Sequence, residues 1–257
     1  MMISVGIDIG SITAKAAIMD DRRLKGTCIL GTGYDAKTAA AAVFAEVLSI
    51  SGYEKKQVDS IIATGYGRKS VAFADKAITE ISCHAAGANF INPEVRSVID
   101  IGGQDSKAMV INAKGKVLDF AMNDKCAAGT GRFLEVMARA LELDLELLGE
   151  ISLKSEAPST ISSLCTVFAE SEVISLIAKG EKRENIVAGI HASIGARVVA
   201  MAGRLGLQPP VMMTGGVAKN VGLVHMLEEK LKMPVEVSEH AQVLGAIGAA
   251  MITVNVK

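Results

Sequence analysis

Hydrophobic and polar residues follow two different spacings along this chain. Short apolar runs such as Val5–Ile9, Ile61–Ala63 and Val211–Met213 end in glycine-containing polar turns, and they predict buried β-strands. Longer segments place apolar residues at helical spacing, which predicts helices over 38–49 and near 131–142, 166–179 and 185–204. Strands that alternate with helices predict an α/β fold.

One strand-and-turn pattern occurs twice, 92 residues apart. The segment 7–10, Ile-Asp-Ile-Gly, recurs at 99–102, and the same offset places Lys15 on Lys107. Each copy reads as a strand, a polar turn and a second strand. The repeat therefore predicts two β-hairpins that open two similar lobes.

Composition and length allow both lobes to be compact. The chain has 257 residues, of which 50% are apolar and 21% charged, so it is able to bury a sizeable core. We expect a first lobe over 1–92, completed by a buried C-terminal helix within 241–257, and a second lobe over 93–240. The formal charge of −1 offers no basic surface, so we expect no nucleic-acid or membrane partner. The N-terminus lacks an export signal, which predicts a cytoplasmic location.

The repeated turns have the chemistry of a phosphate site. Asp8 and Asp100 each end a buried strand, and the turns after them contain Gly10-Ser11 and Gly102-Gly103. Glycine lets the backbone approach an anion, turn N–H groups donate to it, and a carboxylate binds Mg²⁺. A third turn, Thr214-Gly215-Gly216, opens a helix. One such turn is as readily an ordinary tight turn, but three together favour a phosphate site.

The four cysteines fall into two pairs. Cys126 and Cys165 each come shortly before a predicted helix, whose positive N-terminus favours a bound anion such as a thiolate-ligated iron–sulfur cluster. One chain supplies two of the four thiolates that a cubane needs, and a twofold homodimer supplies four. Spacing alone favours the other interpretation, that both are small buried apolar residues. Cys28 and Cys83 are interpreted as buried structural residues.

Three motifs resemble those of a known superfamily. The segments 5–11, 99–105 and 211–217 are similar to the two phosphate motifs and the adenosine motif of the acetate kinase, sugar kinase, heat-shock protein 70 and actin superfamily. The resemblance implies a two-lobed, actin-like ATPase with duplicated ribonuclease-H-like domains and a nucleotide cleft between them. It implies that Asp8, Asp100 and Gln104 organise Mg²⁺ and the attacking water. It also implies ATP/ADP contacts from Gly10, Ser11, Ile12, Thr13, Lys15, Gly102, Gly103, Gly215, Gly216, Val217 and Asn220.

The cysteine motifs narrow this resemblance. The segments 123–133, 165–174 and 64–68 resemble the activator component of 2-hydroxyacyl-CoA dehydratases, a family that includes the ATPase subunits of benzoyl-CoA reductase. The resemblance implies a homodimer in which Cys126 and Cys165 of both subunits hold one 4Fe-4S cluster. It implies an electron donor, ferredoxin or flavodoxin, and ATP-dependent electron delivery to the dehydratase. Ile12 departs from the family, which has a small or hydroxyl residue there, and Thr13 is the next hydroxyl in the turn.

Two alternative functions stay open at this point. One is a small-molecule kinase of the same superfamily, acting on a sugar or amino sugar without a cluster. The other is a nucleotide-dependent assembly module that catalyses no transfer. The kinase alternative leaves Cys126 and Cys165 without a role, and the chain lacks the extra subdomains that actin and heat-shock protein 70 have.

Overall fold

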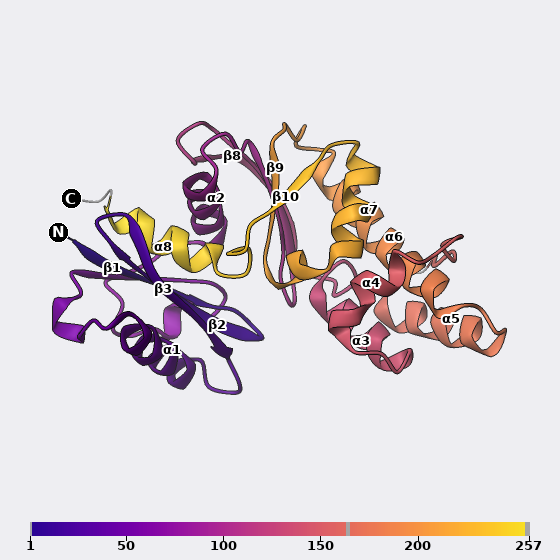
Figure 1. Cartoon of the computed structure of the whole chain (residues 1–257), viewed down its shortest axis with the longest axis horizontal. Helices are drawn as coiled ribbons and strands as arrows, with labels where there is room; N and C mark the ends of the chain where they lie inside the picture. The colour runs from indigo at the N-terminus through magenta and orange to yellow at the C-terminus, as the bar shows by residue number, and fades with distance from the viewer. Residues whose placement is uncertain (1, 163–164, 255–257) are drawn as a thin grey trace. The chain divides into compact units, whose positions relative to one another are not determined.

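The computed structural model describes residues 2–162 and 165–254. The chain forms two compact units, one made of Met1–Val98, Ile111–Leu118 and Ser238–Lys257, the other of Ile99–Val110 and Asp119–Val237. Two five-stranded sheets form the framework of the fold (Figure 1).

The first sheet has the strand order β3-β2-β1-β4-β5. Strand β1 lies at its centre, antiparallel to β2 and parallel to β4. All seven residues of β1 are buried, which explains its nearly continuous apolar sequence. The strands are β1 (Ile3–Ile9), β2 (Thr13–Asp20), β3 (Arg23–Gly31), β4 (Ser60–Thr64) and β5 (Lys76–Ala77).

Helices cover both faces of this sheet. Helix α1 (Ala36–Ser51) packs on the face that carries the isoleucine and valine side chains of β1. Alternate residues of β1 point to the other face, where the Ser4 hydroxyl donates to the Ala250 carbonyl at 3.0 Å. That second face is covered by α8 (Leu244–Val254), which packs along α2 (Glu80–Ile91) (Figure 1). The predicted buried C-terminal helix is thus α8.

The second sheet repeats the topology of the first. Its order, β10-β9-β6-β7-β8, is the first order read backwards, so β6 corresponds to β1 and β7 to β2. The two hairpins predicted from the 92-residue repeat are confirmed, and the repeat extends to five strands. The strands are β6 (Ser97–Ile101), β7 (Ser106–Ile111), β8 (Val117–Asn123), β9 (Val211–Thr214) and β10 (Val235–Val237).

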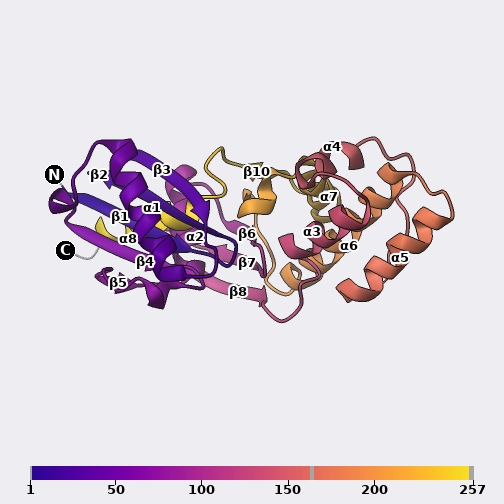
Figure 2. The ribbon, with the colours of Figure 1, turned by 90° about the horizontal axis from the view of Figure 1, so that it is seen from below.

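A group of helices follows in the second unit. Helix α3 packs against α5, while α6 packs against α4 and α7 (Figure 2). Their bounds are α3 (Gly131–Ala140), α4 (Leu148–Ser152), α5 (Thr166–Ala178), α6 (Arg183–Ala202) and α7 (Val221–Leu231). Within the described residues, α6 is long and apolar enough to cross a membrane, but 56% of its most apolar window is buried inside the protein, as in the core helix of a globular fold.

Candidate functional site

The first predicted phosphate turn joins β1 to β2. The Gly10 N–H donates to the Thr13 carbonyl at 3.0 Å, and the Thr32 hydroxyl donates to the Gly10 carbonyl at 2.8 Å. Asp8 is buried at the end of β1, and Lys15 Nζ lies 3.2 Å from Asp8 Oδ2. The side chain of Ile12 is exposed and adds no polar atom to the turn. The turn therefore presents backbone next to an ion pair between the buried Asp8 and the half-buried Lys15.

The second predicted phosphate turn has the same construction. The Gly102 N–H donates to the Asp105 carbonyl at 2.9 Å, as the Gly10 N–H does to Thr13. Lys107, 1% exposed, lies 3.2 Å from Asp100 and 2.9 Å from Asp105. Gln104 is exposed in this turn. Asp105 and Lys107 belong to the site although the sequence analysis did not select them; the match of Lys107 to Lys15 in the repeat was the available signal.

A glycine turn lies beside each aspartate. Gly215 follows β9 with φ +89°, and a Cβ there would sit 2.4 Å from the Ile101 carbonyl oxygen and 2.8 Å from Asp100 Oδ1. Gly65 follows β4 with φ +86°, and its Cβ would sit 2.3 Å from Asp8 Oδ1. Only glycine fits either place. The turn at Gly65 is thus the counterpart, in the first unit, of the predicted adenosine turn at Gly215. The sequence analysis did not recognise this correspondence.

Other predicted nucleotide residues lie just after Gly215. Gly216 begins a short 3-10 helix, Gly216–Lys219, that contains the buried Val217. The Asn220 side chain is engaged within the fold: its Oδ1 accepts from the Leu223 N–H at 2.9 Å, and its Nδ2 lies 3.1 Å from His191 Nε2. An amide nitrogen only donates, so Nε2 accepts, and burial lowers the pKa of His191 to about 4, which keeps it neutral.

Cys126 lies in a loop that the side chains of Asn123 and Thr130 organise. Asn123 accepts from the Cys126 N–H at 3.2 Å and donates to the Cys126 carbonyl at 2.8 Å. The Thr130 hydroxyl donates to the Ala127 carbonyl at 2.6 Å and closes the loop before α3. Cys126 is half-buried, and Arg197 Nη1 donates to its sulfur at 3.9 Å.

Cys165 has different surroundings. It is the N-cap residue of α5 and is exposed. The sequence analysis treated the two cysteines as equivalent, which is wrong in detail: Cys126 lies five residues before α3, because the Ala127–Thr130 turn intervenes. Cys28 and Cys83 are buried as expected, and burial raises the pKa of Cys28 to about 11 and that of Cys83 to about 12. Cys126 and Cys165 are thus the accessible thiols of this chain.

The N-terminus of α3 is bonded to the second phosphate turn. The Gly131 N–H donates to the Gly102 carbonyl and the Arg132 N–H to the Gly103 carbonyl, both at 2.8 Å. These are donors that a helix N-terminus leaves without helical partners. Two backbone hydrogen bonds therefore join the turn at Gly102 to the helix that follows Cys126.

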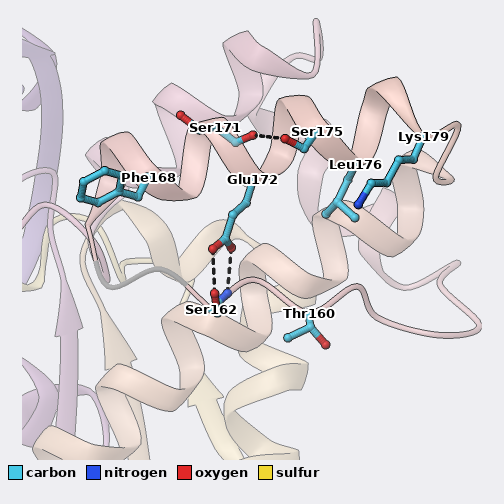
Figure 3. Close-up of a pocket in the computed structure, with 8 residues that line it drawn as sticks. All are labelled: Thr160, Ser162, Phe168, Ser171, Glu172, Ser175, Leu176 and Lys179. Atoms are coloured by element: carbon cyan, nitrogen blue, oxygen red, sulfur yellow. Dashed lines mark hydrogen bonds between the residues drawn. The ribbon is translucent and has the colours of Figure 1, made fainter.

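A pocket of about 500 Å³ lies beside α5 (Figure 3). Glu172 accepts from the Ser162 N–H at 2.8 Å and from the Ser162 hydroxyl at 2.7 Å, as Figure 3 shows. These two hydrogen bonds tie α5 to the segment that precedes Cys165.

Comparison with known proteins identifies the family of this chain. Residues 5–253 match the BadF/BadG/BcrA/BcrD ATPase family. The chain belongs to this ATPase family. The ATPase is 46% identical over 253 residues to the 2-hydroxyisocaproyl-CoA dehydratase activator of Clostridioides difficile, covering 97% of this chain and 94% of that protein.

Solved structures agree with this assignment. The ATPase superposes on component A of (R)-2-hydroxyglutaryl-CoA dehydratase from Acidaminococcus fermentans with a TM-score of 0.95 at 46% identity, covering 98% and 97% of the two chains. It superposes on the activator of the 2-hydroxyisocaproyl-CoA dehydratase from Clostridium difficile, solved with bound ADPNP, with a TM-score of 0.93 at 44% identity, covering 99% and 95%. The predicted actin-like ATPase fold and the predicted dehydratase-activator family are confirmed.

Proposed function

We propose that this ATPase is the activator of a 2-hydroxyacyl-CoA dehydratase, or of a related enzyme of the benzoyl-CoA reductase type, and delivers a low-potential electron to it. The electron donor is a ferredoxin or flavodoxin, and the location is the cytoplasm. The observation that supports this proposal most strongly is the pair of accessible thiols, Cys126 and Cys165. Both lie in the unit whose phosphate turn is hydrogen-bonded to α3. The sugar-kinase alternative gives that pair no role.

The thiols fit a shared 4Fe-4S cluster. Within the described residues, no group of three or more His, Cys, Asp or Glu side chains is placed to hold a metal, so one chain offers an incomplete ligand set. Cys126 and Cys165 of two copies complete the four thiolates in a homodimer. The cluster, when bound, supplies one-electron transfer. The residues of this chain hold it and set its surroundings.

The turns fit a magnesium nucleotide. In this proposal, Gly10, Ser11, Ile12 and Thr13 of the first turn and Gly102 and Gly103 of the second bind phosphate through the backbone, with Lys15 adding charge. Asp8 and Asp100 orient Mg²⁺ and its water, and Gln104 orients the attacking water. Gly215, Gly216 and Val217 approach the adenosine. Because the Asn220 amide is bonded inside the fold, its contribution is to fix this turn. In this proposal the functional lobes follow the sequence repeat, 1–92 with 241–257 and 93–240, although Ile111–Leu118 belongs to the first compact unit.

Helix α3 couples the bound nucleotide to the cluster ligand Cys126. The Gly102 and Gly103 carbonyls accept from the first two N–H groups of α3, and the Asn123–Thr130 loop ties Cys126 to the start of the same helix. ATP binding that shifts the second turn therefore shifts the support of Cys126. Such a link makes the cluster environment depend on nucleotide, which energy-coupled electron transfer needs.

The surface beside Cys165 supports contact with other protein chains. Four large apolar side chains of α5 are exposed, among them Phe168 at 66% and Val167 at 65%. Phe168 points away from the ribbon of α5 in Figure 3. Exposed apolar side chains on the helix that begins after Cys165 favour an interaction surface there.

Anaerobic purification tests the proposal. We expect about four irons and four sulfides per two chains, with a native mass of twice 26.8 kDa. A colourless, iron-free preparation from the same procedure, with ATPase activity intact, would contradict the proposal and favour the kinase alternative.

A further inference from the structure

Different positive groups lie next to the two proposed cluster ligands. Cys165 is the N-cap residue of α5 and therefore stands at the positive end of that helix. Cys126 has no such helix end, because the first N–H groups of α3 donate to Gly102 and Gly103. Its sulfur instead accepts a long hydrogen bond from Arg197 Nη1 at 3.9 Å.

The fold holds Arg197 in this place. Arg197 is half-buried on α6, whose side chains form much of the core of the second unit. A Cβ on Gly129, in the loop that carries Cys126, would sit 3.5 Å from Arg197 Cδ, so the loop packs on the arginine stem. Asn123 fixes the same loop from its other end. The loop therefore packs on the stem of Arg197 and is itself held by Asn123, which keeps the guanidinium next to the Cys126 sulfur.

We infer that Arg197 is a positioning residue that raises the reduction potential of the cluster by donating to Cys126. A positive donor at a ligand sulfur stabilises the reduced cluster, which carries one more negative charge, over the oxidised one. Arg197 thus makes the cluster reducible by its electron donor, while the nucleotide state changes its surroundings. This inference rests on the proposed function.

Potentiometry followed by EPR spectroscopy on the anaerobic holoprotein tests it. Arg197→Gln removes the charge, and we expect the equilibrium constant for one-electron reduction to fall about tenfold, which is about 59 mV. Arg197→Lys keeps a cation and is expected to retain most of the potential. Arg183→Gln is the matched control, since it removes an exposed arginine roughly 21 Å away along the same helix at 1.5 Å per residue.

The possible outcomes separate the inference from the proposed function. Loss of iron in Arg197→Gln with retention in Arg197→Lys also supports the inference, because charge at Cys126 is then required to hold the cluster. Unchanged potential in Arg197→Gln overturns the inference, and so does loss of iron in both variants, which indicates packing alone. A wild-type protein without iron overturns the proposed function itself.

Discussion

Cys126→Ser and Cys165→Ser each abolish the cluster, because each subunit then supplies one thiolate instead of two. A serine hydroxyl at neutral pH is a poor substitute for a thiolate. Whether dimeric or monomeric, each variant purified without oxygen is expected to lack the brown absorbance of the cluster and to contain almost no iron. ATP hydrolysis should remain, since neither residue lies in the phosphate turns.

The two buried cysteines give the matched controls. Cys28 donates to the Val43 carbonyl at 3.2 Å inside the first unit, and Cys83 is fully buried under α8. Burial raises the pKa of both thiols, so neither is available as a thiolate. Cys28→Ser and Cys83→Ser should keep the cluster. Retention of about four irons per two chains in Cys126→Ser or Cys165→Ser would contradict the ligand assignment.

Asp8→Asn and Asp100→Asn spare the cluster but remove electron delivery. The carboxylates orient Mg²⁺ and its water, and an isosteric amide loses the charge that binds the cation. We expect ATP turnover to fall roughly 10²-fold or more, as for loss of a catalytic proton-transfer or water-orienting group. Electron delivery to the dehydratase should become undetectable. ATPase assays, iron analysis and a dehydratase activation assay measure the three effects.

The structure indicates that Asp100→Asn folds. In Asp100→Asn the buried Lys107 keeps its ion pair with Asp105 at 2.9 Å, so no buried cation is left alone. Asp119→Asn, on the exposed part of β8, is the matched control and should retain wild-type turnover. Wild-type turnover in Asp8→Asn and Asp100→Asn would place the nucleotide site elsewhere.

Much of the fold was predictable because it is duplicated. The 92-residue repeat identified both hairpins, and the apolar spacing predicted α1, α3, α5 and α6 to within a few residues. Strands β5 and β10 have two and three residues, too few to show a period, and the sequence analysis did not predict them. The matching strand orders of the two sheets became visible only in the structure.

The parts of the candidate site that consist of a few consecutive residues were predictable from the sequence. Glycine and aspartate at the ends of apolar strands indicated the turns, since that chemistry depends on a few consecutive residues. Contacts between distant residues were not predictable: Arg197 is 71 positions from Cys126, and the Gly131 and Gly102 backbones meet only after both elements fold. The unequal surroundings of Cys126 and Cys165 follow from those distant contacts.

Iron loss to a chelator under different nucleotide states tests the central claim, that nucleotide binding changes the cluster site. The reduced protein is exposed to the chelator without nucleotide, with ADP, and with a non-hydrolysable ATP analogue, with nucleotide binding measured separately. We expect iron to leave about fivefold faster or more with the ATP analogue than with ADP, in the range of ordinary allosteric coupling, because the shifted α3 uncovers the cluster. Identical rates in all three conditions, with both nucleotides bound, would contradict the account and leave the cluster as a structural clamp between subunits.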